Sequence, residues 1–177
     1  MNVSLIKKIW SLIIVLIIGA NVMAQKDVKF KSNNFPKDPK GFQKAMSNLK
    51  TGDNLVNDKR NFREALNFYL PAHDFNPNNS ELNFKIGVCY FYSEKKHLCL
   101  PYLEKAYELD PKVNKDICYF LGRGCHINYE FDRAIQFFEM FKNQRGVNTE
   151  YLKSTPRHIE ECLNAKVLVQ DTLFVDI

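Results

Sequence analysis

The sequence lacks the short motifs through which most enzymes bind phosphates or activate nucleophiles. Its seven glycines are scattered over 177 residues, and it contains no glycine-rich phosphate loop, no GxSxG motif and no HExxH motif. It also lacks a CxxC pair, the commonest signature of a structural zinc site. From these absences we predict a protein that is not an enzyme, has no cofactor and turns over no small-molecule substrate.

A concentrated charge of one sign is missing as well. The formal net charge is +5, from 25 Lys and Arg against 20 Asp and Glu, and the basic residues do not gather in one segment. Nucleic-acid binding depends on a concentrated basic face, so we expect no nucleic-acid partner. With 45% apolar and 25% charged residues, the composition is that of an ordinary globular domain and argues against disorder.

The longest apolar run lies near the N-terminus, at residues 9–20. Lys7 and Lys8 precede it, and the small-residue stretch Val22-Met23-Ala24 follows it, as in a signal peptide. A run of this length is short for a membrane helix, which needs about 20 residues. We therefore predict a signal peptide over residues 1–24 and export to the periplasm, with or without association to the outer membrane. A retained N-terminal anchor is the alternative.

Five cysteines follow the predicted cleavage site, all in apolar helical contexts. An odd count leaves one thiol without a partner even in an oxidising compartment. A free cysteine in such a context behaves as a small hydrophobic residue, so we favour core cysteines over a disulfide framework. The five residues are Cys89, Cys99, Cys118, Cys125 and Cys162.

Residues 25–37 are polar and show no periodicity, and they predict a flexible lead. The segment 38–169 that follows contains an internal sequence repeat. Small residues recur at a spacing of 34 between Ala65 and Cys99 and of 35 between Cys99 and Ala134. The other residues that recur in the same frame are Gly52, Gly87 and Gly122, then Tyr69, Leu103 and Phe138, then Ala72 and Ala106, and then Pro77 and Pro111.

This period and pattern resemble the tetratricopeptide repeat, a unit of two antiparallel helices with small residues at fixed positions. The glycines would lie where the second helix of each unit crosses the first. The resemblance implies an all-α tetratricopeptide-repeat α-solenoid with three helix-turn-helix repeats. It needs a C-terminal capping helix, which we place from Thr155-Pro156 to Leu168. Residues 170–177 predict a short β-like tail.

Local signals place the ends of several helices. Asp38-Pro39 predicts a helix start, and Asn61 with Glu64 predicts a capping box. Ser80 is predicted as a further N-cap residue. Pro71 and Pro101 fall within predicted helices; we expect a kink at Pro71 and place Pro101 in the first turn of a shortened helix.

The leader, the segment IGVCYFYSEKKHLCLPYLEKAYELDP and the segment IEECLNAKVLV together resemble the start of multidomain envelope proteins. Those proteins carry tetratricopeptide repeats, a β-propeller and a C-terminal OmpA-like peptidoglycan-binding domain, and some serve in type IX secretion. The resemblance implies a role in envelope biogenesis or type IX secretion. It also makes 170–177 a tail leading to a missing domain, so any contact with peptidoglycan would be indirect.

The first helices of such repeats line a groove, so we predict a scaffold that binds an envelope protein or a peptide segment there. The projected groove residues are Phe84, Lys85, Val88, Phe91, Tyr119, Arg123, His126 and Ile127. Some of these aromatic side chains could instead pack inside the protein, which would leave a structural spacer with a filled groove. A second alternative is a thiol- or zinc-dependent protein that uses Cys125, His126, His158 and Cys162.

Overall fold

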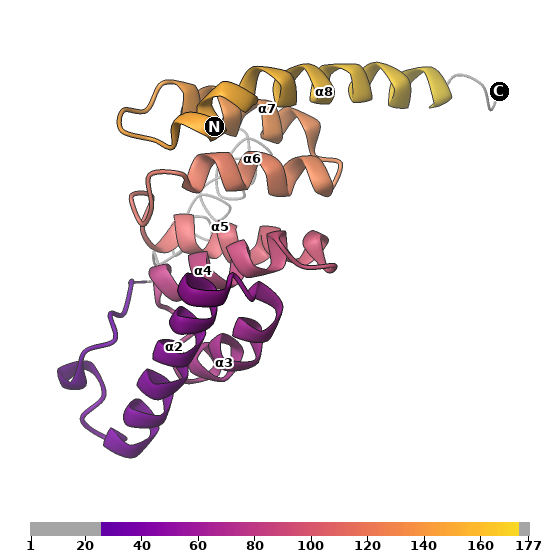
Figure 1. Ribbon diagram of the computed structural model, residues 1–177. Helices are drawn as coiled ribbons and strands as arrows, with labels where there is room; N and C mark the ends of the chain where they lie inside the picture. The colour runs from indigo at the N-terminus through magenta and orange to yellow at the C-terminus, as the bar shows by residue number, and fades with distance from the viewer. Residues whose placement is uncertain (1–25, 174–177) are drawn as a thin grey trace, which may run out of the picture.

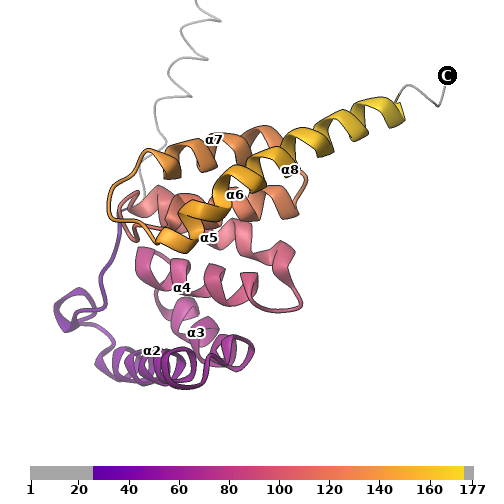
Figure 2. The ribbon, with the colours of Figure 1, turned by 45° about the horizontal axis from the view of Figure 1, so that its top comes forward.

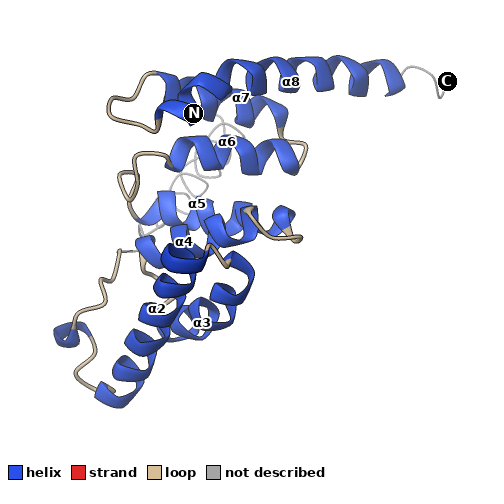
Figure 3. Ribbon diagram, viewed as in Figure 1, coloured by secondary structure: helices blue, strands red, loops and turns tan. Residues whose placement is uncertain are grey.

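The computed structural model describes residues 26–173, so the predicted signal peptide lies outside the described residues. Over residues 26–173 the chain is helical, without a strand, which confirms the all-α class (Figure 3). The α-helices are α2 (Pro39–Lys59), α3 (Phe62–Phe75), α4 (Ser80–Phe91), α5 (Cys99–Leu109), α6 (Ile117–Ile127), α7 (Phe131–Lys142) and α8 (Thr149–Leu173). Two short 3-10 helices, η1 (Ser32–Asn34) and η2 (Lys96–Leu98), accompany them.

The helices stack in the order of the sequence. The closest neighbours are the pairs α2–α3, α4–α5 and α6–α7, and each pair packs on the next (Figure 1). Helix α8 lies against α6 and α7 at one end of the stack, and its second half projects beyond the other helices (Figures 1 and 2). The result is an extended molecule built from consecutive layers.

A glycine lies at the crossing of the two helices in each pair. A Cβ atom on Gly52 would lie 2.5 Å from the ring of Tyr69, and one on Gly122 would lie 2.6 Å from the ring of Phe138. Gly87 meets Leu103 in the same way, at 2.6 Å. The glycines therefore lie at the crossings, as the sequence pattern predicts. The large residue of the second helix fills the space that each glycine leaves empty, which the pattern did not predict.

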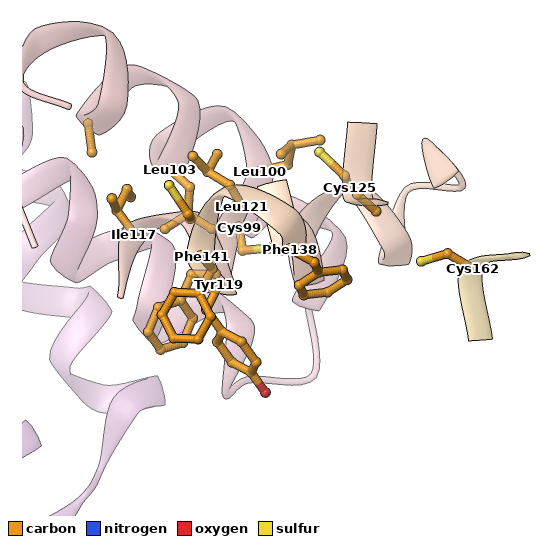
Figure 4. Packing of buried hydrophobic residues seen from close by; sticks show 14 residues of the cluster. Cys99, Leu100, Leu103, Ile117, Tyr119, Leu121, Cys125, Phe138, Phe141 and Cys162 are labelled. Carbon is orange, nitrogen blue, oxygen red and sulfur yellow. The ribbon is translucent and has the colours of Figure 1, made fainter. Parts of the chain in front are cut away.

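The buried side chains form two clusters along the stack. One cluster belongs to α2, α3 and α4 and includes Leu55, Tyr69 and Ile86. The other belongs to α5, α6, α7 and α8, where the rings of Tyr119 and Phe138 lie close together (Figure 4). The core of the described residues therefore has two parts, and the partly buried Tyr90 packs against both of them.

The predicted starts of α2 and α3 agree with the structure, and the predicted cap of α4 differs by one residue. Asp38 accepts a hydrogen bond from the amide of Gly41 at 2.8 Å, and Asn61 accepts one from the amide of Glu64 at 3.1 Å. At α4 the capping side chain is that of Asn79, which accepts from the amide of Leu82 at 2.8 Å, so Ser80 is the first helical residue. Either residue type caps well, and the sequence alone could not distinguish them.

Helix α8 differs from the predicted capping helix at both ends. It begins at Thr149 because Asn148 accepts a hydrogen bond from the amide of Glu150 at 2.9 Å, and Pro156 lies in its interior. It continues to Leu173, since no glycine or proline stops it. The prediction of a β-like tail over 170–177 is therefore wrong as far as Leu173, and residues 174–177 lie outside the described part.

Residues 27–35 form a strap that packs across the stack, where the sequence predicted a flexible lead. Asp27 accepts hydrogen bonds from the amide and the hydroxyl of Ser80, at 2.9 and 3.0 Å. The amide of Val28 donates to the carbonyl of Asn78 at 2.7 Å, and Phe30 packs against the α2–α4 cluster. The strap holds the start of α4 through these tertiary contacts.

Candidate functional site

A cavity opens between α2 and α4, on the face formed by the first helix of each pair. Its volume is about 230 Å³. The residues that line it are Asp53, Val56 and Asn57 of α2, Tyr69 of α3, and Phe84, Lys85, Val88 and Cys89 of α4. Three of the eight predicted groove residues, Phe84, Lys85 and Val88, are among them. The site therefore combines apolar walls with a few polar groups.

Lys85 is the charged centre of this cavity. Its ammonium group lies 2.9 Å from Asp53 and 3.0 Å from Glu81, and the hydroxyl of Tyr69 donates to Asp53 at 2.6 Å. Burial lowers the pKa of Lys85, but the hydrogen bonds to the two carboxylates outweigh it, so the pKa is raised. Lys85 is therefore charged at neutral pH, and the two carboxylates exceed it by one negative charge.

The remaining predicted groove residues do not form one open surface with this cavity. Phe91 packs edge-on against Phe120, with ring centroids 5.5 Å apart, and the guanidinium of Arg123 lies 5.4 Å from the Phe91 ring centroid. His126 packs edge-on against Phe131, and Ile127 is half-buried at the end of α6. Phe91, Arg123 and His126 therefore contact other side chains of the protein and do not line the cavity.

Helix α8 covers the part of the face that belongs to α6. Tyr119 is 5% exposed, and its ring stacks on that of Tyr151 with centroids 4.3 Å apart. Arg123 donates a hydrogen bond to Nε2 of His158 at 2.9 Å. The prediction of Tyr119 and Arg123 as open groove residues is corrected here, because α8 stacks on α6 as α6 stacks on α4.

The residues proposed for the zinc or thiol alternative are engaged in other contacts. Nδ1 of His158 lies 2.8 Å from Glu161, and its other ring nitrogen faces Arg123. Within residues 26–173, no group of three or more His, Cys, Asp and Glu side chains is arranged to hold a metal ion. Both ring nitrogens of His158 thus already have protein partners.

All five cysteines are free and buried, as the sequence analysis favoured. Burial raises the pKa of Cys89 and Cys125 to about 12 and that of Cys99 and Cys162 to about 11. Burial also raises the pKa of Cys118. A thiol acts as a nucleophile through its thiolate, so burial makes these groups inert at neutral pH.

Sequence analysis missed Asp53 and the α8 residues of this region. Asp53, Val88 and Arg123 follow one another at intervals of 35 residues, so they occupy the same position in successive pairs. Extending the projected groove back by one interval would have found Asp53. Tyr151 could not be found this way, because the predicted capping helix began after it.

Comparison of the sequence with models of known protein families finds no match. A comparison with curated proteins finds no match either. Of the helices that the structure describes, none has the length and apolar character needed to span a bilayer. The function is therefore argued from the geometry of the site and from the residue pattern.

Proposed function

We propose that this chain is a non-enzymatic scaffold that holds a peptide segment of a partner protein in the cavity between α2 and α4. The observation that carries the proposal is the cavity itself. Its walls include Val56, Phe84 and Val88, while Lys85 and Asp53 provide charged groups beside them. Pockets that bind ligands commonly combine such apolar walls with a small number of polar groups.

We also propose that the stack is a tetratricopeptide-repeat α-solenoid with three repeats. The support is the recurrence of one crossing geometry: Gly52 against Tyr69, Gly87 against Leu103 and Gly122 against Phe138. The three glycines are spaced by 35 residues. Each unit in such a solenoid contacts mainly its neighbours and presents its first helix to a shared binding surface.

The cellular setting that we propose is the bacterial envelope. The signal-peptide pattern of residues 1–24 supports export to the periplasm, with or without association to the outer membrane. The resemblance to multidomain envelope proteins supports a place in envelope biogenesis or type IX secretion, with an envelope protein as the partner. Nothing in this chain corresponds to the peptidoglycan-binding domain of those proteins.

A structural spacer is the second candidate function, and one specific observation favours it. Helix α8 covers Tyr119 and Arg123, so part of the face is filled by the chain itself. If the cavity between α2 and α4 also had no occupant, the stack would serve only to position other parts of an assembly.

A bulky substitution at the mouth of the cavity distinguishes the peptide-binding function from the spacer function. Asn57 is exposed and lines the cavity, whereas Asp58, the next residue of α2, is exposed and does not line it. We expect Asn57→Trp to reduce capture of an envelope protein by the chain from Gln25 onward about tenfold or more, which corresponds to about 1.4 kcal/mol. The measurement is quantitative mass spectrometry of proteins retained from an envelope fraction.

Asp58→Trp is the matched control, since it adds the same side chain one position away. Both variants should keep the helical circular dichroism of the unmodified chain. Equal capture by all three chains would place binding outside the cavity and would support the spacer function.

A further inference from the structure

Helix α8 is held at the end of the stack by an aromatic and hydrogen-bonded contact with α6 and α7. The rings of Tyr151 and Tyr119 are nearly parallel, at 5°, and the ring of His158 stacks on Phe138 with centroids 5.7 Å apart. His158 is only 3% exposed, and Cys162, one turn further along α8, is fully buried. In the docked position of α8, His158 is therefore buried against the rings of α6 and α7.

The contacts of His158 define the position of its single ring proton. An arginine side chain can only donate hydrogen bonds, so Nε2, which faces Arg123 at 2.9 Å, must be the unprotonated acceptor. Nδ1 then carries the proton and donates to Glu161 at 2.8 Å. Only the neutral form of His158 satisfies both partners.

The charged and titratable groups around His158 come from two helices. Arg123 and the hydroxyl of Tyr119 face it from α6, and Glu161 and Arg157 act on it from α8 itself. From α7 its described ring contact is the uncharged ring of Phe138. A proton on Nε2 would be placed against the guanidinium of Arg123, a repulsive contact in a buried position.

Glu161 favours the protonated form through its hydrogen bond, but its effect on the pKa of His158 is smaller than that of burial. Its side chain is 44% exposed, so water screens its attraction for a charged imidazole. Burial is the largest effect on His158 and, together with the charges of Arg123 and Arg157, it lowers the pKa below its ordinary value. The neutral form is therefore the one that the docked helix requires.

We propose that α8 is a pH-sensitive latch, which protonation of His158 releases from α6. Release uncovers Tyr119 and Arg123, which continue the face on which the α2–α4 cavity opens. The latch itself does not depend on the proposed function, although its use in controlling access to the face does. Its test therefore contains no binding partner.

The direction of the pH effect follows from the lowered pKa. A released His158 titrates near 6.5, and a docked one titrates below that value. The docked state is therefore fully favoured above about pH 6.5 and is disfavoured as the pH falls toward the pKa of the docked form. Within that window the released fraction rises up to about tenfold per pH unit.

Cys162 provides a native probe of release, because it is buried on α8 only while the helix is docked. The rate at which 4,4′-dithiodipyridine labels each cysteine would be measured by mass spectrometry between pH 4.5 and 7.5. Each rate would be normalised to the same thiol in an unstructured peptide. Cys89, buried on α4 in the other cluster, reports unfolding of the α2–α4 part. Cys99, fully buried on α5 in the same cluster as Cys162, reports unfolding of that cluster and should stay protected as well.

We expect the normalised labelling of Cys162 to rise up to about tenfold per pH unit below 6.5 while Cys89 stays protected. His158→Gln keeps an uncharged acceptor and donor, so its Cys162 labelling should not depend on pH. His97→Gln, which removes a histidine outside α8, should keep the slope of the unmodified chain.

Three results would overturn the latch. They are Cys162 labelling that does not change with pH, a slope retained by His158→Gln, and Cys89 labelling that rises in step with Cys162. If His158→Gln does not fold at pH 7.5, the comparison of Cys162 with Cys89 in the unmodified chain decides the question by itself.

Discussion

At the scale of single residues, the glycines at the helix crossings have the clearest physical role. We expect Gly122→Ala to lower the free energy of unfolding by about 1–3 kcal/mol. The added methyl would meet the ring of Phe138 at 2.6 Å, and overpacking of a filled core has a cost of that size. Urea unfolding followed by circular dichroism measures the change.

Asn164→Ala, at an exposed position of α8, is the control and should stay within about 0.5 kcal/mol of the unmodified chain. If Gly122→Ala also left the free energy of unfolding within about 0.5 kcal/mol of the unmodified chain, Phe138 would be able to move aside and the crossing would not require glycine.

Sequence reasoning at this scale succeeded where the partners are close in the chain. The Asn61–Glu64 cap was predicted because its hydrogen bonds join residues three positions apart. It failed for Asp53 and Tyr69, whose hydroxyl–carboxylate hydrogen bond depends on how two helices cross. The repeat frame identifies small and large residues, but it does not show which polar side chains meet.

At the scale of elements, the strap shows how much a short segment can contribute to a helix end. The carboxylate of Asp27 accepts two hydrogen bonds from Ser80, the first residue of α4, where the helix dipole favours a negative charge. Burial raises the pKa of Asp27, but the hydrogen bonds with Lys29 and Ser80 outweigh it, so the pKa is lowered.

We therefore expect Asp27→Asn to lower the free energy of unfolding by about 1 kcal/mol at neutral pH, as the loss of a helix cap does. A group with a lowered pKa stabilises the fold above its ordinary value of 3.8 and loses that effect as the pH falls through the folded value. The difference between the two chains should accordingly shrink at acidic pH, which urea unfolding at several pH values would detect. Asp58→Asn, at an exposed site, is the matched control.

The structure differs from the sequence prediction at two elements: the strap, which is held by distant contacts, and the start of α8, where two local helix-start signals compete. The strap was predicted as a flexible lead because residues 25–37 show no period, and its partners lie about 50 residues further along the chain. The start of α8 was misplaced because Thr155-Pro156 is a typical helix start, whereas Asn148 provides the actual cap. The partners of the strap lie too far along the chain for a local pattern to reveal them, whereas Asn148 is itself a common N-cap residue and the local sequence offered both helix starts.

At the scale of the whole molecule, contacts concentrate within each helix pair and, beyond it, between helices that follow one another in the chain. Such a molecule opens locally, since weakening one layer need not weaken a distant one. We expect Asp27→Asn to accelerate hydrogen exchange in α2, α3 and α4 several-fold while exchange in α6 and α7 changes little. Hydrogen exchange followed by mass spectrometry tests this, and uniform acceleration along the chain would show that the stack unfolds as one unit.

The order of the layers could be predicted from the sequence, because one pattern of small and large residues repeats through the segment 38–169. The sequence could not predict which part of the face formed by the first helix of each pair stays open. That part is set by two segments outside the helix pairs α2–α3, α4–α5 and α6–α7: the strap beside the start of α4 and the first half of α8 beside α6. Neither segment carries the repeated pattern.

The strap also has a consequence for chain entropy. Asp27 and Ser80 lie 53 residues apart, so their contact closes a large loop in a chain whose five cysteines are all free. Closing such a loop costs chain entropy on folding, and that cost grows only slowly with loop length. Unlike a disulfide, these hydrogen bonds break on unfolding and leave the unfolded chain unrestricted. The hydrogen bonds of the strap thus act as a reversible cross-link. Cleavage of the backbone between residues 36 and 38 would leave the strap on a separate fragment. Its contact with α4 would then be bimolecular and would dissociate on dilution.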